Sequence, residues 1–372
     1  MKYKEIETQE QLQNLLEAEE SKICFAAFQN LDLSPWADAV LQKEWQECIF
    51  LGCRMNEKIQ YYISDKNYIF PALNLPYNMY PANLYSAGQL YDKYVLGNPE
   101  TYENTFDKCV YNHFLATGKE AESISESLAR SLHDHSITDA MYDFLANYEE
   151  KKVLAVMGGH GLSRQSEDYK QIARLSKQLT EENYLMTSGG GPGAMEATHL
   201  GAWFAGSSEK DLTEAFRILE QAPNYKHKNW LEQALKVTEM FPLRKPYESL
   251  GIPTWFYGHE PPTPFATKIA KFFANSIRED LLLSIAKGGI IFSPGSAGTL
   301  QEIFQEVTQN HYLSFGFSSP MIFINQQFWK QDFPAFSFLQ SMQQSGKLKN
   351  LKLACHDDIQ AIIKELKNTV WD

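Results

Sequence analysis

Two kinds of segment alternate along the second half of the chain. Short apolar runs predict buried strands at 153–157, 184–187, 252–257, 290–292 and 321–325. Amphipathic stretches predict helices at 169–179, 194–205, 212–219, 230–240, 265–286 and 359–366. Strands that alternate with helices are typical of a parallel sheet covered on both faces. We therefore predict an α/β fold with a doubly wound parallel sheet, Rossmann-like, over residues 149–372.

The first 148 residues follow a different pattern. A polar helical stretch at 7–19 precedes two apolar segments, 23–28 and 47–51, which predict strands separated by a helix. The stretch 61–111 is rich in Tyr, Pro and Asn, and its prolines argue against regular helix. Its aromatic side chains fit either a ligand pocket or a domain or subunit contact. Residues 114–148 again predict a helix, so we expect a mixed α/β N-terminal extension over residues 1–148.

Charge and composition narrow the classes of partner. A formal net charge of −12 over 372 residues argues against an extended nucleic-acid surface. A small anion held by backbone amides remains compatible with that charge. No apolar run approaches the roughly 20 residues that span a bilayer, and no segment resembles a secretion signal. We expect a soluble, cytoplasmic protein with no membrane partner.

Neither the cysteines nor the histidines predict a metal site. The 5 cysteines are scattered and lack paired C-x-x-C spacing, so reduced thiols are expected. His133 and His135 are two residues apart on a predicted helix, which places them on different faces. A polar contact or a substrate contact therefore fits the 133–135 segment better than a shared metal ion.

Three glycine-rich segments follow predicted strands, at 158–161, 189–193 and 293–299. The carboxyl ends of parallel strands meet at one edge of a sheet, so the three segments predict one ligand crevice. The last segment leads into a helix, whose unpaired N–H groups and positive dipole end suit a phosphate. Residues 189–194 also match the dinucleotide pattern G-x-G-x-x-A, but they follow the second strand of their unit, and Pro192 removes an N–H. No G-x-S-x-G elbow follows a strand to support a serine nucleophile.

Residues 189–197, GGGPGAMEA, and 294–302, PGSAGTLQE, together resemble the paired signature of the LOG (LONELY GUY) family, long mislabelled as lysine decarboxylases. The resemblance covers roughly residues 150–330, and the first 148 residues resemble an extension found only in some bacterial members. It implies a phosphoribohydrolase that cuts the N-glycosidic bond of nucleoside 5′-monophosphates or cytokinin nucleotides, releasing free base and ribose 5-phosphate. It also implies a homo-oligomer, at least a dimer, and no cofactor or metal. Lysine decarboxylation is not expected, because no lysine lies in a recognisable pyridoxal phosphate context.

The family pairs a motif glutamate with an arginine of the preceding helix, and these fall on Glu302 and Arg278, the predicted catalytic residues. A carboxylate can stabilise oxocarbenium-like charge and orient water, while Arg278 could hold phosphate or neutralise the leaving base. The alternative for either residue is an ordinary salt bridge, including one to the other. Two departures from the family pattern, Glu279 for lysine and Ser296 for glycine, motivate an alternative function as a non-catalytic nucleotide sensor or carrier.

The remaining candidate residues come from the glycine segments and the loop after the third predicted strand. Substrate and phosphate binding is predicted for Gly158, Gly159, Arg164, Gly189, Gly190, Gly191, Gly193, Glu196, Gly295, Ser296, Ala297, Gly298 and Thr299. A solvated surface position is the alternative for Arg164. The base is predicted to contact Tyr257, His259 and Glu260, through stacking or protonation, with core packing as the alternative for the aromatic side chain.

Overall fold

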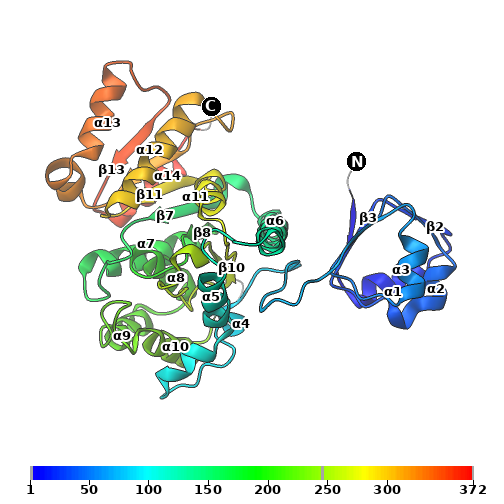
Figure 1. Ribbon diagram of the computed structural model, residues 1–372. Helices are drawn as coiled ribbons and strands as arrows, with labels where there is room; N and C mark the ends of the chain where they lie inside the picture. Colours follow the sequence, from blue (N-terminus) through cyan, green and yellow to red (C-terminus); the bar gives the residue numbers. More distant parts are fainter. Residues whose placement is uncertain (1–2, 244–246, 371–372) are drawn as a thin grey trace. The chain divides into compact units, whose positions relative to one another are not determined.

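The computed structural model describes residues 3–243 and 247–370 (Figure 1). Contacts divide the chain into two compact units. The first comprises the residues up to Leu84 together with His113–Asp143, and the second comprises Tyr85–Asn112 together with the chain from Phe144 onward. The boundary predicted after residue 148 stays a prediction. The contact units differ from it chiefly at Tyr85–Asn112, which groups with the second unit.

The second unit is built on a seven-stranded, fully parallel sheet with the order β10-β9-β8-β7-β11-β12-β13. Its strands are β7 (Val153–Met157), β8 (Leu185–Ser188), β9 (Ser249–Gly251), β10 (Lys268–Ile269), β11 (Gly289–Phe292), β12 (Pro320–Phe323) and β13 (Lys352–Cys355). The chain adds β8 to β10 on one side of β7 and then returns to place β11 on the other side. The order therefore reverses between β7 and β11, which confirms the predicted doubly wound α/β fold.

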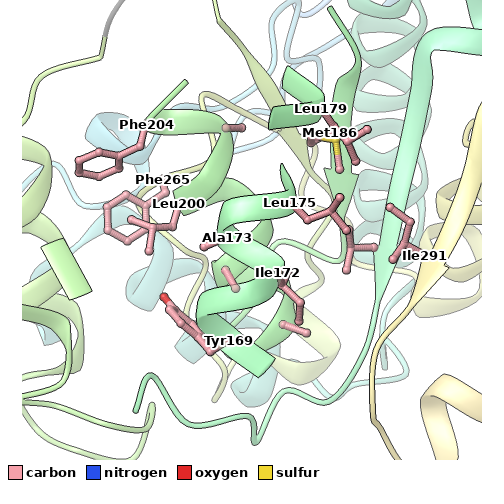
Figure 2. Packing of buried hydrophobic residues seen from close by; sticks show 14 of the residues in the cluster. Tyr169, Ile172, Ala173, Leu175, Leu179, Met186, Leu200, Phe204, Phe265 and Ile291 are labelled. Carbon is pink, nitrogen blue, oxygen red and sulfur yellow. The ribbon is translucent and has the colours of Figure 1, made fainter. Parts of the chain in front are cut away.

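The helices of this unit precede the first strand, connect the strands or follow the last one. They are α4 (Ala87–Leu90), α5 (Phe106–Ala116), α7 (Glu167–Glu181), α8 (Ala194–Trp203), α9 (Glu209–Leu219), α10 (Trp230–Met240), α11 (Asn275–Ser284), α12 (Ala297–Tyr312), α13 (Ala335–Gln344) and α14 (Ile359–Lys367). Figure 2 shows Leu175 and Leu179 of α7 on the side of the helix that faces Met186 and Ile291 of the sheet. Each of these four side chains is at most 1% exposed, so this face of the sheet is closed to solvent.

The first unit has two small parallel sheets, with the orders β1-β3-β5-β6 and β2-β4. Its elements are β1 (Lys4–Ile6), α1 (Gln9–Glu17), β2 (Lys22–Cys24), β3 (Ala26–Gln29), α2 (Ala37–Leu41), β4 (Glu44–Gln46), β5 (Ile49–Leu51), α3 (Glu57–Ile63), β6 (Tyr68–Phe70) and α6 (Ile124–Leu145). The register pairs Lys22 with Glu44 and Phe28 with Phe50, 22 residues apart in both cases. The rings of Phe28 and Phe50 stack at 4.8 Å in the buried core of this unit.

The structure divides the strand predicted at 23–28 into β2 and β3, and it confirms the strand predicted at 47–51 as β5. Phe25, at φ 53°, separates β2 from β3, and Glu47, at φ 55°, follows β4. A left-handed residue turns the chain sharply, so the apolar run at 23–28 contributes to two different sheets, and the run at 47–51 begins after β4 has ended. Residues with side chains seldom adopt this conformation, and the sequence carries no glycine there to signal it.

Three further predicted elements are wrong in type or extent. The helix predicted at 265–286 is instead strand β10 followed by α11, because apolar positions that suit an amphipathic helix also suit a short buried strand. The strand predicted at 252–257 is not formed. The nearest strand, β9, ends at Gly251 before Pro253, and Trp255–Tyr257 is a 3₁₀ turn. The helix predicted at 114–148 is divided near Gly118, at φ 82°, into α5 and α6.

Within the part of the chain that the structure describes, no helix is both long enough and apolar enough to cross a membrane.

Candidate ligand-binding crevice

A crevice of about 470 Å³ opens where the strand order reverses. It is lined by Gly158, Gly159, His160, Met195, Tyr257, Glu260, Arg278, Glu279, Ser296, Ala297, Gly298, Thr299, Gln301, Glu302 and Gln305. The residues after β7 and those after β11 thus meet at the edge where α/β sheets bind ligands. The volume lies within the range of about 300–1,000 Å³ that small-molecule sites occupy.

The first glycine segment joins the two strands at the reversal. A Cβ on Gly158 would overlap the hydroxyl of Ser293, the residue after β11, so only glycine lets the two strand ends approach this closely. The Gly159 N–H donates to the carbonyl of Pro294 at 3.1 Å. These contacts hold the floor of the crevice together.

The start of α12 lies at the crevice and belongs to the third glycine segment, for which the sequence predicts anion binding. Ser296 is the N-cap residue, but its side chain makes no capping hydrogen bond. The first N–H groups of a helix have no partner within the helix, and they carry the positive end of its dipole. Ala297, Gly298 and Thr299 line the crevice at this point, so a phosphate could accept hydrogen bonds from the helix start.

Glu302 projects from the next turn of α12 into the same crevice. Its carboxylate makes no hydrogen bond to another described residue and no ion pair within 4.0 Å. Burial raises the pKa of Glu302 to about 7, the nearby charge of Arg278 opposes this rise, and Glu279 adds to it. A carboxyl group without a partner that titrates near neutral pH is suited to proton transfer.

Arg278 reaches the crevice from α11 and is fixed by the backbone around it. Its Nε donates to the carbonyl of Ile252 at 2.9 Å, and its guanidinium lies where a Cβ on Gly189 would be. Among the described residues it forms no ion pair within 4.0 Å, so the salt bridge to Glu302 considered from the sequence is not formed. Its charge remains available to a ligand.

Glu279, the first departure from the family pattern, is held on the crevice wall by two amides. Its Oε1 accepts from Asn275 Nδ2 at 2.6 Å, and its Oε2 accepts from Gln301 Nε2 at 3.0 Å. These hydrogen bonds hold the carboxyl group of Glu279 on the crevice wall that also carries Glu302.

Arg164 and Glu196 do not line the crevice. Arg164 is 1% exposed, and its Nε donates to Glu196 Oε2 at 2.8 Å while its Nη2 donates to Glu196 Oε1 at 2.5 Å. Arg164 Nη1 donates to the carbonyls of Ala222 and Trp230. The hydroxyl of Tyr169 completes the cluster by donating to Glu196 at 2.9 Å. Because their polar atoms are used on each other, the structure gives these two residues a packing role in place of the predicted phosphate contact.

The second glycine segment supports the crevice from outside it. Gly189, Gly190, Gly191 and Gly193 are absent from the crevice lining, as is Gly295 of the third segment. Gly189 leaves the space that the Arg278 guanidinium occupies. The structure therefore brings the first and third segments to the crevice, whereas the second segment packs against Arg278.

Residues of the loop after β9 line two different cavities. Tyr257, 40% exposed, and Glu260 line the crevice, whereas His259 lines a separate pocket. Glu260 Oε1 lies 3.7 Å from His160 Nδ1 and 3.8 Å from His259 Nε2. Glu260 and His160 thus place two ionisable side chains close together on the crevice wall.

Four lining residues were not among the residues singled out from the sequence: His160, Met195, Gln301 and Gln305. Gln301 and Gln305 flank Glu302 at helical spacing, so a helix drawn from residue 297 would have placed them on or beside the same face.

The described residues contain no group of three or more His, Cys, Asp or Glu side chains that could hold a metal ion. His133 is fully buried, and its Nδ1 lies 3.0 Å from Asp134 Oδ1. The 133–135 segment is therefore placed by a buried polar contact.

No protein-family model and no curated protein matches the chain. Among solved structures, the molybdenum cofactor binding protein of the phototrophic bacterium Rippkaea orientalis is 15% identical, with a TM-score of 0.36, over 58% of this chain and 94% of that one. A Moco carrier protein of Chlamydomonas reinhardtii is 14% identical, with a TM-score of 0.34, over 58% of this chain and 98% of that one. At this level of similarity, the ligand must be argued from the residues of this chain.

Proposed function

We propose that this protein binds a nucleotide or a related phosphorylated small molecule in the crevice, and that it is a LOG-type protein. The observation that carries the proposal is the uncapped start of α12 at the strand reversal, with the guanidinium of Arg278 in the same cavity. A phosphate there would accept from backbone N–H groups and meet a cation that has no carboxylate partner. Tyr257 supplies an exposed ring on which a base could stack.

A second candidate function is hydrolysis of the N-glycosidic bond of a nucleoside 5′-monophosphate. The observation that favours it is Glu302, a carboxyl group without a partner, whose pKa burial raises to about 7. In this reaction the oxygen of water bonds to C1′ as the C1′–N bond breaks, and the departing base takes the bonding electrons. Glu302 would accept the proton from water, and Glu260 or His160 would supply a proton to the base. The products are free base and ribose 5-phosphate.

One sample of purified full-length protein tests both candidates. Calorimetry with AMP, GMP, CMP, UMP and IMP measures binding, and an assay for ribose 5-phosphate measures cleavage. Binding with intact nucleotide recovered afterwards supports a carrier or sensor, whereas release of ribose 5-phosphate supports the hydrolase. If folded protein neither binds nor cleaves any of the five, the nucleotide proposal is wrong.

A further inference from the structure

A second pocket, of about 190 Å³, lies on the other side of the loop that carries Tyr257 and Glu260. Its ionisable lining groups that can be positive are Lys108, Lys226, Lys228, His227 and His259, and no aspartate or glutamate lines it. The crevice has the opposite character, since three glutamates and one arginine line it. An anionic group that is not bound by backbone N–H groups would therefore favour the second pocket over the crevice.

The lysines of this pocket are largely uncommitted. Lys226 and Lys228 are exposed and, among the described residues, make no ion pair within 4.0 Å. Lys108 Nζ lies 3.4 Å from Glu103, whose side chain is 61% exposed, so this pair is solvent-screened and weak. The Lys108 ammonium also lies 5.6 Å from the ring centre of Tyr102, which lines the pocket. This aromatic contact adds to the weak pair with Glu103 and helps to hold the charge at the pocket wall.

A helix start adds a second, independent source of positive potential. Helix α10 has 11 residues, and its first residues, Trp230 and Leu231, line the pocket. Its N-cap, Asn229, makes no side-chain capping hydrogen bond. The N-terminal dipole of α10 therefore acts on the same space as the lysines.

The size of the pocket limits what it can hold. At about 190 Å³ it is smaller than the sites of about 300–1,000 Å³ that enclose whole small molecules. It nevertheless adjoins the crevice, because the ring of Tyr225 on its wall lies 5.8 Å from the ring of His160 on the crevice wall. The dimensions suit one charged group that belongs to a larger ligand.

We propose that this lysine pocket is an anion subsite that binds a phosphate group. The phosphate comes either from the far end of the ligand in the crevice or from a separate phosphorylated molecule. Only the first of these two sources rests on the proposed function, because it requires a nucleotide in the crevice.

Inorganic diphosphate is the probe, titrated into the full chain by calorimetry at low and moderate salt. The test variant is Lys226→Gln with Lys228→Gln. The matched control is Lys347→Gln with Lys349→Gln, a second pair of exposed lysines with the same spacing and away from both cavities. We expect the test variant to bind diphosphate about tenfold more weakly, with a smaller salt dependence, and the control to bind like wild type. Equal affinity in all three proteins, or no binding by wild type, would overturn the subsite.

The same variants distinguish the two sources of phosphate. If the group belongs to the crevice ligand, wild type should prefer ADP to AMP, the test variant should lose that preference, and saturation with ADP should weaken diphosphate binding. If it belongs to a separate molecule, diphosphate should bind equally well with and without saturating ADP. Failure of all nucleotide binding with diphosphate binding retained would reject the proposed function and leave the subsite standing.

Discussion

The carboxyl group of Glu302 couples the crevice to the stability of the fold. Its folded-state pKa is about 7, against an ordinary value of 4.5, and burial is the main cause. The folded protein therefore binds this proton more tightly than the unfolded chain does. Between about pH 4.5 and pH 7 the unfolded state loses its proton first, so stability contributed by the protonated form declines as pH rises.

Glu302→Gln should remove this dependence, because a neutral amide has no charge to desolvate. We expect the variant to match wild type at pH 4.5 and to be more stable by about 1–3 kcal/mol at pH 7.5. Denaturant unfolding at several pH values measures the difference. A variant less stable than wild type at pH 7.5 would show that Glu302 is a structural partner of its surroundings.

Glu306, one turn further along α12, provides the control for that measurement. Burial raises its pKa to about 7 as well, but its Oε1 accepts from Ser319 Oγ at 2.9 Å and from Asn310 Nδ2 at 3.0 Å. The oxygen of a glutamine can accept both hydrogen bonds. Glu306→Gln should therefore also be more stable than wild type above pH 5. Its nucleotide affinity should be unchanged, because Glu306 does not line the crevice.

A catalytic role for Glu302 predicts a second effect of the same substitution. If hydrolysis occurs, its carboxylate acts on charge and a proton that develop only in the transition state. Glu302→Gln should then lower the single-turnover rate about a hundredfold, roughly 3 kcal/mol, with little change in nucleotide Kd. The wild-type rate should rise with pH through about 7, where the carboxylate forms. A near wild-type rate in a stable variant would remove Glu302 from the catalytic residues.

The Arg164–Glu196 pair should contribute to the fold, with only an indirect effect on the ligand. Both side chains are at most 1% exposed, so removal of one leaves the other charged and desolvated. We expect Glu196→Gln to cost about 3–5 kcal/mol of unfolding free energy. The double variant Arg164→Met with Glu196→Leu should lose less, because no charge remains unpaired. Chemical denaturation of the three proteins tests this order, and an unchanged Glu196→Gln would contradict it.

At the scale of elements, the loop after β8 should act on the ligand through Arg278. Gly189→Ala would place a methyl group where the guanidinium lies, and the Nε bond to the Ile252 carbonyl could not keep its position. We expect nucleotide affinity to fall about tenfold, the scale of one lost charge-assisted hydrogen bond. Gly161→Ala is the control, since its added Cβ meets no atom within 4 Å. Equal affinities of the two variants would show that Arg278 does not depend on this loop.

Elements with one clear period were predictable from the sequence. The prediction at 153–157 matches β7, and that at 230–240 matches α10, because a short apolar run and an amphipathic stretch each suit one structure. The sequence does not predict strand β13 or helix α13, and the helix that it predicts at 265–286 includes strand β10, because tertiary packing and not local period decides such segments. The sequence predicts a ligand crevice at the carboxyl edge of a parallel sheet, but it does not predict that the strand order reverses between β7 and β11.

Among the residues of the crevice, the sequence predicts those whose position follows from a local turn or from helical spacing. The start of α12 follows from a glycine-rich turn before a helical pattern, and Glu302 follows from its spacing to that turn. The pairing of Arg164 with Glu196 joins residues far apart in the sequence, so no local spacing revealed it. The lysine pocket likewise combines the 94–108 and 225–231 segments, which only the folded second unit brings together.

At the scale of the whole molecule, the first unit carries a feature that favours self-association. Strand β6 is an edge of its sheet, and its outer side has no strand partner among the described residues. Tyr68 and Phe70 on this strand are 53% and 39% exposed, and Tyr61 on the preceding helix is 86% exposed. An open edge flanked by exposed aromatic side chains is a site where strands of two copies can pair, and aromatic residues are enriched at such contacts.

We therefore predict that the full chain is at least a dimer and that β6 forms part of the contact. Light scattering at micromolar concentration should give about twice the 42.6 kDa mass of one chain. Tyr68→Lys with Phe70→Lys should shift the protein toward the monomer, because two ammonium groups would have to be desolvated at the paired edge. Tyr312→Lys, at a side chain 74% exposed in the second unit, is the control and should leave the mass unchanged. A wild-type mass of 42.6 kDa would reject the dimer, whereas a dimer that survives both β6 substitutions would place the contact on another surface.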